Sequence, residues 1–247
     1  MFFRLLNLLL LRSWHVRKEV RRWLRGAPPG ARVLDAGSGF GQYVWFVSRL
    51  RKDIRVKGID VKDEEVETGN RFFGGGTEGS RVIFEKADLL EFCEPETYDL
   101  ALCIDVLEHI EEDVRVMSNI CRSLKPGGTL IISTPSDLGG SDVHGDEDHS
   151  FIGEHVRDGY STEEISGKLT EAGYSSVEAR YTYGRWGSIS WKISMKFPIW
   201  LLGRGRIFFL LLPVWYLLTF PVALVLNFFD IWTLNRTGTG LLVKAVK

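Results

Sequence analysis

Short apolar segments alternate with helical patterns along most of this 247-residue chain. Apolar runs of strand length lie at 32–34, 54–59, 81–85, 98–104, 129–133 and 176–181. Segments with helical periodicity separate them, at 42–50, 61–73, 111–124 and 161–172. Because strands that alternate with helices pair in parallel, the pattern predicts an α/β fold with a doubly wound, mostly parallel sheet.

The first predicted strand ends at Asp35 and leads directly into glycines at alternate positions, Gly37, Gly39 and Gly41. Glycine is favoured where the backbone turns sharply off a strand and lets a ligand approach closely. The helix predicted at 42–50 points its free N–H groups at the same turn. The stretch therefore predicts a nucleotide-binding turn at the carboxyl end of the first strand, where open α/β sheets bind their ligands.

The spacing of these glycines argues against two common nucleotide-binding motifs. A dinucleotide fingerprint, G-x-G-x-x-G, needs a third glycine where Gln42 or Val44 stands. The phosphate loop of ATPases, G-x-x-x-x-G-K-[ST], is also absent from the sequence. NAD-dependent oxidoreduction and ATP hydrolysis are therefore disfavoured.

Composition narrows the function classes further. A formal net charge of −1 argues against a nucleic-acid partner held by bulk electrostatics. The length suits one α/β domain with an elaboration. Cys93, Cys103 and Cys121 are scattered and form no C-x-x-C pair, which favours reduced thiols in a cytosol over disulfides or a zinc site.

Five motifs follow one another in order: VLDAGSGFG at 33–41, GID at 58–60, AD at 87–88, YDL through LEH at 98–109 and LKPGG at 124–128. Together they resemble the class I S-adenosylmethionine (SAM) dependent methyltransferases of the small-molecule type, which include quinone and lipid methyltransferases. The resemblance covers about 27–182 and the chain end. It implies a seven-stranded, Rossmann-like sheet whose antiparallel last strand lies at 240–246.

The same resemblance implies a SAM site along the carboxyl ends of the strands. The methionine moiety would be held by Asp35 and by the loop of Gly37, Ser38, Gly39 and Gly41, with the backbone from Cys103 to Asp105 beside it. Asp60 ends the second strand about twenty residues past the glycines and would accept both ribose hydroxyls. Asp88, followed by Leu89, would accept the adenine amino group. The alternative for Asp88 is a loop carboxylate that caps a helix.

A phenol or enol acceptor of a methyl group needs a base, and three histidines are the candidates. His109 lies beside the expected methyl position. His144 and His149 belong to the acidic segment 135–159, a long loop that would cover the substrate as a lid. Two alternatives for this segment stay open: a solvated acidic loop, and a divalent metal bound by Asp142, His144, Asp146 and His149. The spacing of these four residues is not typical of metal ligands, so we predict no metal site.

The N-terminal segment 1–26 begins apolar and becomes basic, with seven Arg or Lys and one Glu in residues 1–25. Its apolar part is too short to span a bilayer, and no signal-peptide cleavage site is evident. Basic residues beside Leu, Phe and Trp favour an amphipathic helix in a membrane interface. The alternative is an N-terminal helix packed on the sheet.

Residues 207–226 form an uncharged apolar run long enough for one transmembrane helix. A single span would separate 240–246 from the sheet, so we expect a monotopic or re-entrant helical hairpin within 184–236, with Pro213 and Pro221 as two places to break it. A buried hydrophobic subdomain or a dimer interface is the alternative. The core would then comprise 27–183 and 237–247.

These observations predict a SAM-dependent methyltransferase acting on a lipophilic small molecule (a quinone, isoprenoid or lipid) at the cytoplasmic side of a membrane, as a peripheral or monotopic protein. Residues 1–25 and about 205–230 would contact the membrane, which carries anionic lipid on that side. Two alternatives remain: SAM-dependent non-methyl transfer to a lipid, and a catalytically inactive SAM-fold scaffold. The sequence does not identify the acceptor atom or the oligomeric state.

Overall fold

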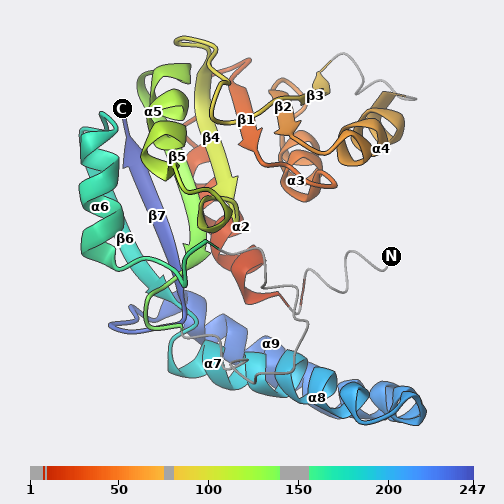
Figure 1. Ribbon diagram of the computed structural model, residues 1–247. Coiled ribbons are helices and arrows are strands. Elements are labelled where there is room, and N and C mark those ends of the chain that lie inside the picture. The colour runs from red at the N-terminus through yellow and green to blue at the C-terminus, as the bar shows by residue number, and fades with distance from the viewer. Residues whose placement is uncertain (1–7, 9, 75–80, 140–155) are drawn as a thin grey trace.

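The computed structural model describes residue 8 and residues 10–74, 81–139 and 156–247. Within these residues one seven-stranded sheet has the order β3-β2-β1-β4-β5-β7-β6 (Figure 1). Its strands are β1 (Arg32–Ala36), β2 (Arg55–Asp60), β3 (Val82–Lys86), β4 (Tyr98–Ile104), β5 (Leu124–Pro135), β6 (Ser176–Thr182) and β7 (Gly240–Val246). Neighbouring strands are parallel except β7, which is antiparallel to both β5 and β6. The predicted fold class is confirmed.

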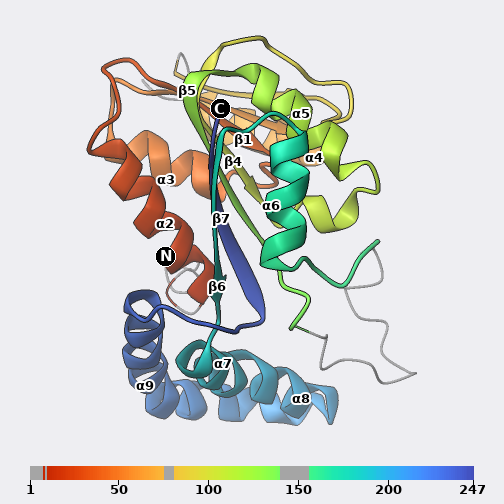
Figure 2. The ribbon, with the colours of Figure 1, turned by 90° about the vertical axis from the view of Figure 1, so that its left-hand side faces the viewer.

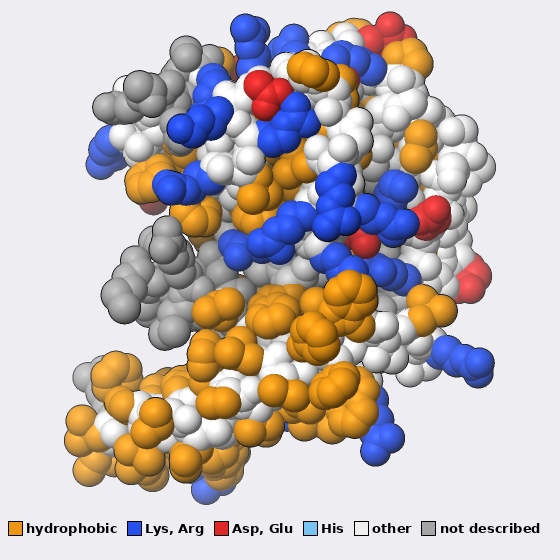
Figure 3. Space-filling model, turned by 180° about the vertical axis from the view of Figure 1, so that it is seen from behind, with side chains coloured by type: hydrophobic (Ala, Val, Ile, Leu, Met, Phe, Trp, Pro, Cys, Tyr) orange, Lys and Arg blue, Asp and Glu red, His pale blue; other side chains and the backbone are white. Residues whose placement is uncertain are grey.

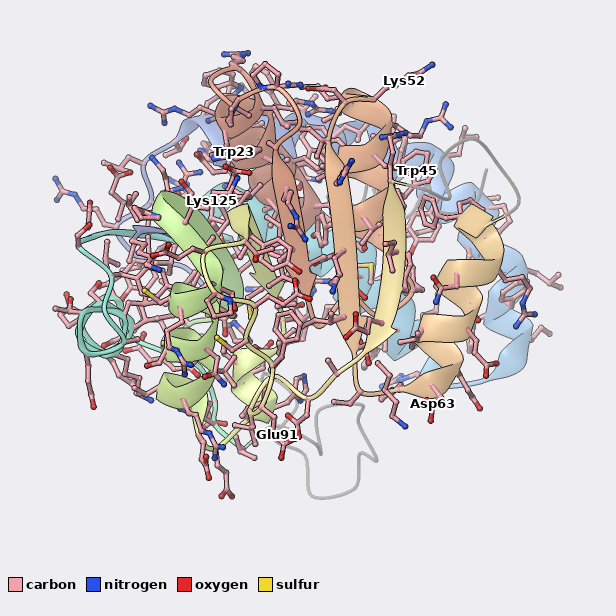
Figure 4. All side chains as sticks on the ribbon, turned by 90° about the horizontal axis from the view of Figure 1, so that it is seen from above. Trp23, Trp45, Lys52, Asp63, Glu91 and Lys125 are labelled. Atoms are coloured by element: carbon pink, nitrogen blue, oxygen red, sulfur yellow. The ribbon has the colours of Figure 1, made fainter. Side chains whose placement is uncertain are left out.

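Helices cover both faces of this sheet (Figure 2). One face carries α2 (Leu11–Leu24), α3 (Gln42–Leu50) and α4 (Asp63–Gly74), and the other carries α5 (Asp113–Ser123) and α6 (Thr162–Glu171). Seen from above, α2 and α3 lie across the sheet from α5 (Figure 4). Buried aliphatic and aromatic side chains fill both interfaces, so the strands between them are covered on both faces.

Most predicted elements lie where the pattern put them. Helix α3 and strand β7 have the predicted bounds, and Ser161 caps α6 by accepting a hydrogen bond from the N–H of Glu164 at 3.0 Å. Strand β5 begins before the apolar run at 129–133, because residues 124–128 also belong to it, and its register against β4 shifts there. Gly127, at φ 75°, accommodates this irregularity.

Helix α2 shows how the N-terminal segment is used. Its apolar face, with Leu11, Val16, Val20 and Leu24, is buried against the domain. This is the packing that an N-terminal helix of an α/β domain would make. The apolar face of residues 11–24 is therefore not available to a membrane, and only the opposite, cationic face of the helix lies outside.

Between β6 and β7 the chain forms an elongated helical arm that projects below the sheet in Figure 1. Its outgoing limb comprises α7 (Arg185–Trp191), a π-helical turn (Lys192–Lys196) and α8 (Phe197–Gly203). Its returning limb comprises a 3-10 turn (Arg206–Leu211) and α9 (Leu212–Trp232). The rings of Phe197 and Trp215 stack at 4.2 Å between centroids, and Trp215 donates its indole N–H to the Ile193 carbonyl at 2.9 Å. The two limbs thus form a hairpin.

The reversal of this hairpin corrects the expectation that proline would break the helix. The chain turns at Gly203–Gly205, before either proline. Pro213 lies in the first turn of α9, where no backbone N–H is needed, and α9 continues through Pro221. An isolated proline costs one helical hydrogen bond, which the surrounding turns of a 21-residue helix tolerate.

Asp230 fastens the arm to the domain. Its carboxylate is fully buried and lies 2.9 Å from Nε2 of His15 on α2. It also accepts the backbone N–H groups of Gly187 at 3.0 Å and Tyr183 at 3.2 Å. Burial lowers the pKa of His15 below its usual value, so the neutral ring donates its Nε2 proton to the carboxylate. A single side chain therefore joins α2, α7 and α9.

The arm is apolar on the outside. Leu210, Leu217 and Leu218 are 75%, 76% and 68% exposed. The helical stretch Ile207–Trp232 is long and apolar enough to cross a membrane, and only 6% of its most apolar 18-residue window is buried. Figure 3 shows this surface as an almost continuous hydrophobic band. Monomeric soluble proteins rarely expose so large an apolar patch without a partner for it.

Candidate active site

The glycine turn between β1 and α3 has the conformation that its sequence requires. Gly37, Gly39 and Gly41 have φ angles of 76°, 48° and 79°, in the left-handed region that favours glycine. The N–H groups of Gly37 and Ser38 both bond to the Ile59 carbonyl at 2.9 Å, which ties the turn to the end of β2. The open side of the turn therefore lies between the ends of β1, β2 and β4.

A second loop packs against the first. Asp105, immediately after β4, adopts a left-handed conformation (φ 54°) and bonds through its N–H to the Ser133 carbonyl at 2.8 Å. The adjacent Val106 side chain lies so close to Gly37 that an added Cβ there would be 2.4 Å from Cγ2. Gly37 thus keeps the two loops in contact, and the strained Asp105 lies where functional sites concentrate such conformations.

Asp60 faces the glycine turn. Its Oδ2 accepts the Gly39 N–H at 2.8 Å and its Oδ1 accepts the Lys62 N–H at 3.0 Å. The carboxylate is half-buried, at the carboxyl end of β2 and next to the turn. The structure therefore brings Asp60 and the glycines together, as a site for a ribose would require.

Asp35 lies buried beneath the same turn. Its carboxyl accepts a hydrogen bond from the Val44 backbone, whereas its Oδ2 has no hydrogen-bond partner among the described residues. Burial, aided by the nearby negative charge of Asp60, raises the pKa of Asp35 to about 7. A buried oxygen without a partner is costly, so this position suits a ligand that brings a donor or a positive charge.

Two further polar groups at the turn have the same property. The Ser38 and Tyr43 hydroxyls are buried and have no hydrogen-bond partner among the described residues.

Asp88 lies farther along the sheet edge, after β3, where its Oδ1 accepts the Leu90 N–H at 2.9 Å and its side chain is exposed. Leu89 is buried. Asp88 thus caps the local turn, and its second oxygen can still meet a ligand.

Comparison with known proteins agrees with this geometry. A family model described as a methyltransferase domain matches residues 28–173. The chain belongs to the class I SAM-dependent methyltransferases. SAM is the cofactor of this family, and the predictions of family and cofactor are confirmed.

Individual relatives are more distant. The methyltransferase is 32% identical over 112 residues to a ubiquinone biosynthesis O-methyltransferase of Hahella chejuensis, covering 44% of this chain and 45% of that protein. It is 29% identical over 167 residues to a 27-O-demethylrifamycin SV methyltransferase of Amycolatopsis mediterranei, covering 64% and 60%. The match thus spans about half the length of these curated relatives.

A solved structure shares the fold over nearly the whole chain. It is a Haemonchus contortus phosphoethanolamine N-methyltransferase 2 in complex with SAM, with a TM-score of 0.64 and 20% identity. The alignment covers 95% of this methyltransferase and 52% of that chain. At this identity the likeness establishes the fold alone.

The residues at the turn fit SAM. SAM carries a positive sulfonium and an α-ammonium, and the buried Asp35 oxygen and the Ser38 hydroxyl offer acceptors for such groups. The carboxylate of Asp60 and the ionisable carboxyl of Asp35 contribute negative charge here, which favours a cation, whereas Asp105 is paired with Arg12. Cys103 is buried at the end of β4, where burial raises the pKa of its thiol, so it remains a neutral part of the wall.

Two residues at this site were not anticipated from the sequence. Glu108 is buried, and its Oε2 accepts the Thr134 hydroxyl at 3.2 Å. Burial raises the pKa of this carboxyl above its usual value. A lone acid inside the apolar turn VLEHI, which precedes α5, is the signal that could have drawn attention to it. Arg12 of α2 forms an ion pair with Asp105, and nothing in the sequence links these two residues.

The candidate histidines are placed unevenly. His109 is exposed beside the buried Glu108. His144 and His149 lie outside the described residues, as does most of the segment proposed as a lid or metal site. Among the residues that the structure describes, no cluster of three or more His, Cys, Asp or Glu side chains could hold a metal ion. The choice of base therefore stays a prediction.

The pKa of Asp35 predicts how SAM affinity changes with pH. Positive groups of SAM near this carboxylate favour its ionised form, so binding releases its proton and strengthens as pH rises toward 7. We expect the dissociation constant to fall about tenfold between pH 6 and 8 in calorimetry. The amine of SAM also titrates, near pH 8, and adds its own pH dependence to the affinity. The Asp35→Asn variant keeps only the pH dependence of this amine, so it is the protein with which the wild type is compared. Parallel pH profiles for the two proteins would contradict the assignment.

Proposed function

We propose that the protein transfers a methyl group from SAM to a lipophilic small molecule, such as a quinone, isoprenoid or lipid, at a membrane surface. When bound, SAM supplies a methyl group on a positively charged sulfur. The protein then has to align the acceptor, exclude water and, for a hydroxyl acceptor, receive a proton. The names of the two relatives, a ubiquinone biosynthesis O-methyltransferase and a 27-O-demethylrifamycin SV methyltransferase, support a small-molecule acceptor.

One observation carries the membrane part of the proposal. The apolar arm lies beyond the carboxyl ends of the parallel strands, the same edge of the sheet that carries the glycine turn (Figure 1). Both ends of the arm return to the sheet, through β6 and β7, so it enters lipid from one side as a hairpin. A protein held in this way places its SAM site near the surface in which a lipophilic acceptor dissolves.

The direct test is product identification. Purified protein is incubated with methyl-labelled SAM and a total lipid extract. The labelled products are then separated, and their masses are determined by mass spectrometry. A methyl ether or a C-methyl product in the lipid fraction supports the proposal. A methylene addition indicates non-methyl transfer to a lipid, and SAM binding without any labelled product favours a scaffold. Either result overturns the proposed reaction.

The arm's contact with lipid can be tested separately. We expect the variant Leu210→Glu/Leu217→Glu to lose sedimentation with phosphatidylcholine vesicles, because both side chains are exposed and charges there enter lipid at a high cost. Phe72→Glu is the matched control, since Phe72 is 69% exposed on α4, away from the arm. Unchanged sedimentation of the arm variant would contradict the proposal, and a shift of the arm variant from dimer to monomer would indicate an interface between copies instead.

We infer that the buried Glu108 is the side chain that receives the acceptor's proton. Glu108→Gln preserves the shape and the bond to Thr134 but cannot accept a proton, so we expect kcat for labelled product to fall about 10²- to 10³-fold. SAM affinity should be unchanged. The neighbouring exposed residue gives the comparison: if His109→Ala reduces kcat more than Glu108→Gln does, the histidine is the base.

A further inference from the structure

A cationic groove runs along α2 beside the end of α9. It has a volume of about 650 Å³ and opens to solvent. Its basic residues are Arg17, Lys18, Arg21, Arg22 and Arg25. Their spacing of three or four places them on one face of the helix, opposite the apolar face that packs on the sheet.

Within the described residues, no ion pair offsets these charges. Among the described residues no carboxylate lies within ion-pair distance of any of the five. Two buried guanidinium nitrogens of Arg17, Nε and Nη2, have no hydrogen-bond partner among the residues that the structure describes. Like charges three and four residues apart repel one another, so the arrangement costs stability unless an anion offsets it.

Aromatic rings position several of these cations. The Arg17 and Arg21 guanidinium groups lie over the Phe46 ring, 4.8 and 5.1 Å from its centroid. Lys18 lies 4.2 Å from the centroid of Trp232 and donates to the Ile231 carbonyl at 2.6 Å. The stacking restricts the side chains without removing their charge, so the groove is prepared for an anion.

The groove is continuous with the apolar surface of the arm. Ile231 and Trp232, at the end of α9, form part of its wall. In Figure 3 a row of Lys and Arg side chains lies directly beside the hydrophobic band. Tryptophan and basic residues at the edge of an apolar surface are typical of the level of the lipid headgroups.

We propose that this groove binds the phosphate headgroup of an anionic phospholipid whose acyl chains lie along α9. The inference rests on the proposed membrane contact of the arm and adds a site that selects the charge of the lipid. The arm supplies apolar contact with any bilayer, whereas the groove recognises phosphate headgroups whose charge is not cancelled by choline.

Vesicle binding separates the two contributions. Full-length protein is sedimented with phosphatidylcholine vesicles and with vesicles containing about one-third phosphatidylglycerol. We expect the wild type to bind the anionic vesicles about 10- to 30-fold more tightly, as several basic residues near the surface would provide. Arg21→Gln/Arg22→Gln, at two exposed positions, should lose most of this preference and keep its binding to phosphatidylcholine.

Arg49→Gln/Lys52→Gln removes the same charge from exposed positions at the end of α3 and after it, which do not line the groove, and should keep the preference. If both double variants lose the preference for anionic vesicles equally, the preference depends on net charge alone and the proposed site is wrong. If millimolar inorganic phosphate abolishes the preference at constant ionic strength, the groove binds free phosphate rather than lipid. Wild-type binding that is equal for both vesicles overturns the groove alone, whereas no binding to either overturns the membrane contact itself.

Discussion

Replacement of Asp60 with alanine is expected to weaken SAM binding by roughly 10²- to 10³-fold. The carboxylate lies beside the glycine turn, and a ribose there would offer it two hydroxyl donors. Hydrogen bonds to a charged acceptor contribute about 1.5–3 kcal/mol each, and the loss of two bonds at the lower end of that range corresponds to this decrease in affinity. The variant also loses the acceptor for the Gly39 N–H, so the turn becomes less ordered before the ligand binds. Isothermal calorimetry with SAM measures the effect directly.

Asp63→Ala is the matched control. Asp63 begins α4 three residues farther along, is exposed, and its ion pair with Lys86 at 2.6 Å is of the exposed kind that contributes little. SAM affinity and thermal stability should both stay close to wild type in that protein. An Asp60→Ala protein that is folded and binds SAM within threefold of wild type would show that the ribose does not bind at the end of β2.

The largest expected effect on stability comes from Asp230→Ala. The change leaves the His15 Nε2–H and the N–H groups of Tyr183 and Gly187 buried without their acceptor. Each such group costs about 1–3 kcal/mol, so we expect a loss of about 4 kcal/mol in the free energy of unfolding. For a chain of this size the melting temperature then falls by roughly 10 °C. Thermal unfolding followed by circular dichroism is the measurement.

A graded series tests whether the hydrogen bonds are responsible. Asp230→Asn retains one acceptor oxygen and should cost less than alanine, whereas the exposed Asp158→Ala should change nothing measurable. Because Asp230 joins α2 to α9, the alanine variant should also expose the arm to proteolysis at temperatures at which the core remains folded. Equal stability of Asp230→Ala and wild type would mean that the arm attaches through apolar packing alone.

Local pattern predicted the sheet and the glycine turn. Strand and helix periods, together with the stops at glycine and proline, depend on neighbours a few residues away, so they can be read from the sequence. Asp60 was predicted for the same reason, since the end of a parallel strand after a glycine turn has one place in the fold. The last strand required more than pattern, because its antiparallel place beside the sixth strand came from the family resemblance.

Local sequence pattern did not predict the contacts between distant parts of the chain. The Arg12–Asp105 ion pair joins residues 93 positions apart by number, and His15 meets Asp230 across a separation of 215. The reversal of the arm at Gly203–Gly205 rather than at a proline depends on which turns pack together, a property of the assembled hairpin. Burial also gave Glu108 its raised pKa, although its neighbour His109 is the more usual base.

The sequence by itself thus determined the fold, the cofactor turn and the presence of one apolar and one basic segment. Only the tertiary structure decided how these two segments are used. It buries the apolar face of α2 and leaves its cations beside the end of α9, because a helix can pack only one face on the sheet. That choice depends on the shape of the complete domain, which no local pattern records.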